Sequence, residues 1–140
     1  MSTDGLTTGL AAEYEAVYVY SSAGPHVGDR LREAVQQGES DHRDRRDAVL
    51  VALDALGTPI PPTEAGYALP EPIVDEETAV AAISDVEERA ARAWRSVLPD
   101  LTGDERRLAA QSLAGSAITA VRWRRAIGDT PITRAFPGRQ

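Results

Sequence analysis

The sequence contains no cysteine and no lysine. Without cysteine, disulfide bonds and thiolate metal ligands are excluded. All 15 basic residues are therefore arginines, a bias that GC-rich codon usage explains as well as any function does. No apolar run approaches the roughly 20 residues that cross a bilayer, and the chain does not begin with a basic segment followed by an apolar one. We therefore expect a cytoplasmic protein with no membrane partner.

Positive charge is in deficit, because 22 acidic residues outnumber 15 basic ones and the formal net charge is −7. This balance disfavours nucleic acid as a partner. The basic run from Arg122 to Arg125 fits a helix C-terminus, where cations are favoured, better than it fits a nucleic-acid patch. Only His26 and His42 could serve a hydroxyl nucleophile as base, and no glycine-rich phosphate loop is present. We therefore do not expect an enzyme.

Helical periodicity marks four segments, and no segment alternates as a strand does. The predicted helices cover residues 3–22, 26–56, 75–98 and 102–127. Glycine or proline ends each of them, with Gly57 as a natural C-terminal cap of the second. Gly38 weakens that second helix by about 1 kcal/mol relative to alanine and raises the possibility of a kink or break. In the irregular tail 129–140, Ile132 and Phe136 are candidates for docking on the helices.

The connections between these helices predict their topology. The first and third connections are short, whereas the link from Thr58 to Val74 is long and rich in proline. At ~3.3 Å per residue this link reaches well over 40 Å, and the third helix is only about 36 Å long. The third helix can therefore start at the opposite end of the molecule, which is the ferritin-like arrangement. We predict one all-α domain over residues 1–140, a ferritin-like four-helix bundle with one long crossover between helices two and three.

Helical spacing places several ionisable residues on the apolar faces of these helices. Glu13, His42 and Glu87 fall among apolar neighbours at three- and four-residue spacing. A buried charge is costly unless it is paired or bound to a metal. We therefore predict a salt-bridged network in the core, in which arginines neutralise the two glutamates. Its candidate members are Glu13, His42, Arg45, Arg46, Glu87 and Arg122.

A metal site is the alternative way to satisfy the same residues. The two-metal carboxylate pattern of four-helix bundles uses Glu, Glu-x-x-His, Glu and a second Glu-x-x-His. The first three parts are present, so iron or manganese could be held by Glu13, Glu39, His42 and Glu87. The fourth part is replaced by Thr119-Ala-Val-Arg122, and an arginine brings positive charge instead of a ligand. A pair of ions is therefore disfavoured, whereas a single-metal half-site and ordinary solvent-facing residues remain open.

Five short runs carry a resemblance to a known family. They are residues 11–20, 42–47, 67–70, 120–124 and 135–138. In this order, and over nearly the whole chain from Leu6 to Gly138, they resemble the actinobacterial ferritin-like family of unknown function. The resemblance implies a ferritin-like bundle and no established activity, substrate or cofactor. It carries iron ligands over only to Glu13, Glu39, His42 and Glu87.

These observations are consistent with three hypotheses about function. The leading hypothesis is a non-catalytic ferritin-like module without a cofactor, which works through binding or assembly as a homodimer. The second is a metal-binding protein of the iron or manganese oxidase or storage type with an incomplete site. The third is a small-molecule binder with its pocket beside Glu13, Tyr18 and His42. We interpret the tyrosines of the first helix and both tryptophans as packing residues.

Overall fold

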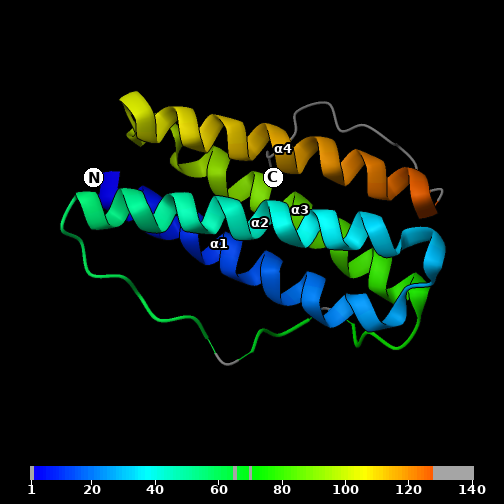
Figure 1. The fold of residues 1–140 in the computed structure, drawn as a ribbon. Coiled ribbons are helices and arrows are strands. Elements are labelled where there is room, and N and C mark those ends of the chain that lie inside the picture. Colours follow the sequence, from blue (N-terminus) through cyan, green and yellow to red (C-terminus); the bar gives the residue numbers. More distant parts are fainter. Residues whose placement is uncertain (1, 65, 70, 128–140) are drawn as a thin grey trace.

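The computed structural model describes residues 2–64, 66–69 and 71–127, and within these ranges the protein is helical with no strand (Figure 1). Its elements are α1 (Ser2–Ala23), η1 (Gly24–His26), α2 (Asp29–Ala55), α3 (Glu76–Val97), η2 (Leu98–Asp100) and α4 (Gly103–Ile127). The all-α prediction is therefore confirmed. The predicted docking of Ile132 and Phe136 lies outside the described residues. None of the described helices is long and apolar enough to cross a membrane.

The helix ends follow local capping chemistry. α2 begins at Asp29, later than predicted, because Pro25 stands in a 3₁₀ turn that precedes it. Its predicted end at Gly57 is confirmed: this glycine has a φ of 68°, and its N–H donates to the Asp54 carbonyl at 3.0 Å. At the start of α3, the Asp75 carboxylate accepts the Thr78 N–H at 2.8 Å in a capping box.

α2 is continuous through Gly38, so the break suggested by that glycine is absent. Gly38 is buried, and a Cβ at this position would lie under 3.0 Å from the ring of Tyr20 on α1. The glycine therefore serves the close approach of an aromatic side chain rather than a change of helix direction.

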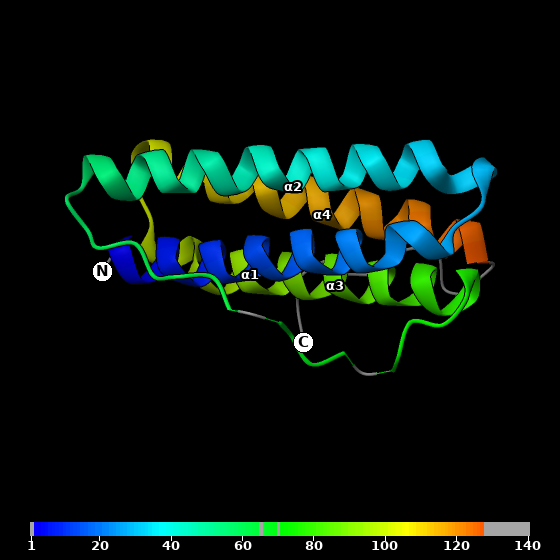
Figure 2. The same cartoon turned by 60° about the horizontal axis from the view of Figure 1, so that its bottom comes forward.

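The connection between α2 and α3 runs along the outside of the bundle. Figure 2 shows it leaving the end of α2 and reaching α3 at the opposite end of the molecule. It follows α1 on the way, since Pro61 and Thr7 line the same cavity and the rings of Tyr67 and Tyr18 are 5.3 Å apart. α2 and α3 therefore point in the same direction. α1 packs on α2 and α3, and α3 packs on α4, while α2 approaches α4 only sparsely.

The apolar core has two parts. One end of the bundle is filled around Leu6, Leu10, Leu53, Trp94 and Leu101. The other is filled around Val19, Tyr20, Val35, Ile83 and Trp123. Along α1, α2 and α3, the residues that fall between these two parts include buried charged ones. The core is therefore interrupted at mid-height by a polar layer.

Candidate functional site

Three ionisable side chains from three helices meet in the polar layer. Glu13 on α1 is 0% exposed, and His42 on α2 and Glu87 on α3 are each 1% exposed. His42 Nδ1 lies 2.6 Å from Glu13 Oε1, and His42 Nε2 lies 2.9 Å from Glu87 Oε2. The imidazole ring thus bridges two buried carboxylates, one at each nitrogen.

This geometry determines the charge of His42. Each of the two short contacts needs a proton between its heavy atoms, and a neutral imidazole carries only one N–H. Burial lowers the pKa of His42, but the hydrogen bonds with Glu13 and Glu87 outweigh burial and raise the pKa from 6.5 to about 9. His42 is therefore an imidazolium at neutral pH, and it neutralises one of the two carboxylates.

Aromatic side chains supply the remaining hydrogen bonds. Trp94 Nε1 donates to Glu13 Oε2 at 2.8 Å, and the Tyr20 hydroxyl donates to Glu87 Oε2 at 2.5 Å. Trp123 Nε1 in turn donates to the Tyr20 oxygen at 3.0 Å. Burial raises the pKa of Tyr20, and the Glu87 charge raises it further, so the phenol stays protonated and keeps donating.

The result is a continuous chain of hydrogen bonds across the bundle, which we call the core network. It runs through Trp94, Glu13, His42, Glu87, Tyr20 and Trp123. Within the described ranges, Glu87 Oε1 is a buried oxygen without a hydrogen-bond partner. Sequence reasoning missed Tyr20 and both tryptophans as members, because their partners lie 67 to 103 residues away along the chain.

Three glycines inside helices make room for this network and its surroundings. A Cβ on Gly9 would lie under 3.0 Å from the Trp94 indole, as it would for Gly38 against Tyr20. A Cβ on Gly115 would also lie under 3.0 Å from the Arg45 guanidinium, the end of a flexible side chain that moves aside more easily than a buried ring. Each mid-helix glycine costs about 1 kcal/mol of intrinsic helix stability. Glycines at such positions are the sequence signal that could have located the large side chains opposite them.

The predicted arginine partners lie elsewhere. Arg45 is half-buried and donates to Ser116 Oγ on α4 at 2.9 Å, while Arg46 pairs with its neighbour Asp47 at 3.0 Å. Arg122 is exposed. None of the three bonds to Glu13 or Glu87, and within the described part of the chain His42 supplies the cation that the sequence assigned to arginine.

The misplacement of Arg122 follows from the composition of α4. The predicted inward face included Ile118 and Arg122, yet Ile118 is 53% exposed. The buried face is made instead by Ser112, Ser116, Ala120 and Trp123, and three of these four are small residues that give little apolar signal. Arg124 is the buried arginine of this helix, and it donates to Glu88 Oε1 at 2.6 Å.

The residues present do not fit a two-metal centre. Glu39 is half-buried and accepts hydrogen bonds from Ser21 and Arg43 instead of facing His42. Both nitrogens of His42 and both oxygens of Glu13 are already engaged with other side chains. Over the described ranges, no group of three or more His, Asp or Glu side chains is arranged to hold a metal ion. The position of the second Glu-x-x-His is Thr119 to Arg122, which offers no ligand of that kind.

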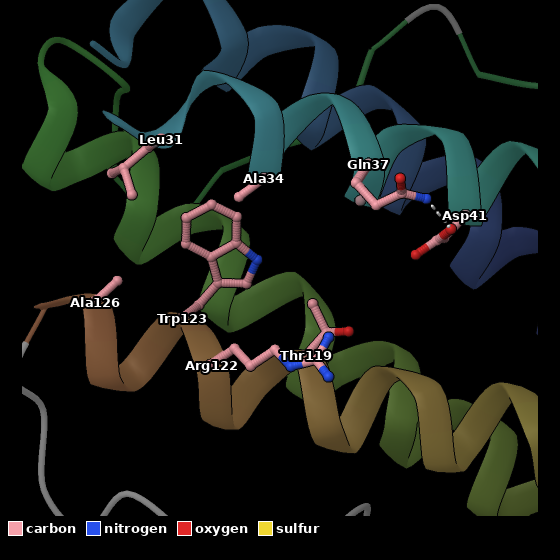
Figure 3. Close-up of a pocket in the computed structure, with 9 residues that line it drawn as sticks. Leu31, Ala34, Gln37, Asp41, Thr119, Arg122, Trp123 and Ala126 are labelled. Carbon is pink, nitrogen blue, oxygen red and sulfur yellow. Dashed lines mark hydrogen bonds between the residues drawn. The ribbon is translucent and has the colours of Figure 1, made fainter. Parts of the chain in front are cut away.

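A groove of about 250 Å³ opens between α2 and α4 (Figure 3). Its wall includes Trp123, whose indole N–H belongs to the core network. The predicted pocket beside Glu13, Tyr18 and His42 is a different place, because none of these three residues lines the groove. Tyr18 instead packs against Tyr67 of the long connection.

Comparison with known proteins establishes the family of this chain. Residues 5–140 match the family described as Domain of unknown function (DUF4439). The chain belongs to this family. It is also similar to a conserved hypothetical protein, Rv2844, from Mycobacterium tuberculosis, whose crystal structure matches with 35% identity and a TM-score of 0.86. That match covers 97% of this chain and 96% of the other. No curated protein matches.

Proposed function

We propose that this DUF4439 protein is a ferritin-like bundle that works through binding and without metal chemistry. The long connection that spans the bundle, with α2 and α3 pointing the same way, supports the ferritin-like topology. The observation that carries the function is His42, held between Glu13 and Glu87 with both ring nitrogens engaged. Metal ligation requires a ring nitrogen without its proton, and each one here is used to bridge a carboxylate.

The core network neutralises part of its own charge. Two carboxylates and one imidazolium leave one net negative charge, which the N–H of Trp94 and the O–H of Tyr20 solvate. Arg45 adds a positive charge close enough to oppose the rise in the pKa of Tyr20. A metal ion would have to displace the bridging protons and break these bonds before it could bind.

Metal analysis tests this proposal. Protein purified from cells grown in iron- and manganese-replete medium is expected to contain far less than one metal ion per chain. Glu39→Ala and His42→Ala are a matched pair, because Glu39 belongs to the metal ligand set but not to the core network. Near-stoichiometric metal in the natural chain, lost in both variants, would overturn the proposal.

The proposal includes a homodimer in the cytoplasm. Sedimentation equilibrium of the full chain is expected to yield twice the 15.0 kDa chain mass. A monomeric mass at all concentrations would contradict this part. Cell fractionation checks the location.

A further inference from the structure

The groove between α2 and α4 has two chemically different ends. Leu31 and Ala34 on α2 face Trp123 and Ala126 on α4 at one end (Figure 3). One or two helical turns away from this end, the residues that line the groove are polar on both helices. Because the two helices run in opposite directions, the polar positions of both fall at the same end.

Opposite charges stand at the polar end. Asp41 comes from α2, and its carboxylate accepts a hydrogen bond from Gln37 Nε2 at 2.8 Å through Oδ1. Within the part of the chain that the structure describes, Oδ2 of Asp41 accepts no hydrogen bond, so it is available to a ligand. Arg122 comes from α4, is exposed, and forms no hydrogen bond or ion pair within the described ranges. One wall of the groove thus offers an acceptor, and the other offers a guanidinium fork.

We propose that this groove binds a small zwitterion with an apolar body, an α-amino acid with an apolar side chain. The carboxylate pairs with Arg122, whose fork suits bidentate recognition of that group. The ammonium pairs with Asp41. The side chain lies on the apolar end against Leu31 and the Trp123 indole. This inference rests on the proposed function and specifies what the binding module recognises.

Other ligand classes fit the same groove less well. A nucleotide or other polyanion would meet a single lining arginine and the repelling carboxylate of Asp41. A divalent cation would find one carboxylate and a neighbouring guanidinium, which is too few ligands and the wrong sign. A fully apolar ligand would leave both charged groups without partners.

Calorimetric titration of the full chain with L-leucine and L-phenylalanine tests the proposal. Phenethylamine lacks the carboxylate and 3-phenylpropanoate lacks the ammonium. Each is therefore expected to bind the groove at least about 10-fold more weakly than L-phenylalanine does. Arg122→Gln and Asp41→Asn should each weaken amino-acid binding by a factor of about 10 or more. Arg125→Gln is the matched control, because Arg125 is an exposed arginine on the same helix that does not line the groove.

Blocking the groove supplies a second variant. Ala34→Phe fills the apolar end from an exposed position on α2, and it should abolish binding while circular dichroism shows an unchanged fold. The proposal is overturned if neither amino acid binds saturably, if the charge variants bind as the natural chain does, or if inorganic phosphate competes as a tighter ligand. Metal content decides the proposed function separately, so the two failures are distinguishable.

Discussion

The proton on His42 couples the stability of the protein to pH. Its pKa is 6.5 in an unstructured chain and about 9 in the core network, which corresponds to roughly 3 kcal/mol of unfolding free energy. Because the folded-state pKa is the higher one, this stabilisation is fully present below about pH 6.5 and is lost as the pH rises through about 9. Urea unfolding measured from pH 6 to pH 10 should therefore show a steady fall in the free energy of unfolding.

The exposed histidine of the chain is the matched control for this profile. His26→Gln should leave the pH dependence unchanged, because His26 stands in the exposed turn before α2. Tyr20 adds to the fall only near pH 10, where the unfolded chain begins to ionise its phenol while burial and the Glu87 charge raise the pKa of the folded one. A free energy of unfolding that stays constant between pH 7 and pH 10 would show that His42 is not charged in the folded protein.

Gly38→Ala tests the close packing of the core network. Alanine is the better helix former by about 1 kcal/mol, so an open position would gain stability from this change. Here the added Cβ overlaps the Tyr20 ring, and we expect a loss of about 1–3 kcal/mol in thermal or urea unfolding.

Two further variants separate packing from helix propensity. Ser40→Ala, at an exposed position two residues further along α2, should be neutral or slightly stabilising. Combining Gly38→Ala with Tyr20→Leu should cost less than the two single changes added together, because the overlapping ring is gone. Strict additivity would contradict the role assigned to Gly38.

At the residue scale, spacing was enough to place Glu13, His42 and Glu87 on inward faces. It was not enough to pair them, because an arginine has a long and flexible side chain and its reach does not determine its partner. Periodicity predicts only a packing role for Tyr20 and Trp94, because their hydrogen bonds depend on contacts between helices that periodicity does not contain. A glycine such as Gly38 indicates that a large side chain packs against it, but only the structure shows which side chain that is.

The long connection is the element on which the topology depends. It joins helix ends at opposite ends of the bundle, and α2 alone, with 27 residues, is about 40 Å long. Replacing residues 58–74 with a four-residue Gly-Ser turn, which spans at most about 14 Å, would force α3 to start beside the end of α2. We expect loss of the cooperative unfolding transition, measured by circular dichroism. A variant that keeps this transition would argue for simple up-down connectivity.

The secondary-structure elements were predictable where apolar and polar residues alternate clearly along the chain. The four helices and the cap at Gly57 followed from periodicity and turn chemistry, and the length of the link at 58–74 suggested its path. The inward face of α4 did not follow, because the apolar Ile118 is exposed whereas the small polar residues Ser112 and Ser116 are buried, so hydropathy points to the wrong face. Which face such a helix buries depends on the shape of its neighbours, and on this helix Gly115 lies against the Arg45 guanidinium.

In the whole molecule, the polar layer divides an otherwise apolar interior. The apolar parts on either side of it could slide or rotate against each other without changing the kind of contact they make. The bonds of His42 to Glu13 and Glu87 hold α1, α2 and α3 in one register. Buried polar groups have fixed helix register in other bundles, and we propose the same role for this layer.

Replacing the whole layer should be better tolerated than replacing its centre. His42→Leu leaves two buried carboxylates without their cation and should cost about 3–5 kcal/mol. The triple variant Glu13→Leu, His42→Leu, Glu87→Leu removes all three charges and leaves only the Tyr20 and Trp94 donors without acceptors, at about 1–3 kcal/mol each. Its cost in urea unfolding should therefore fall several kcal/mol below the sum of the three single variants. The helices of the triple variant should also lose their fixed register, which would be measured as increased binding of a hydrophobic dye. Additive costs would instead mean that the three side chains do not act as one unit.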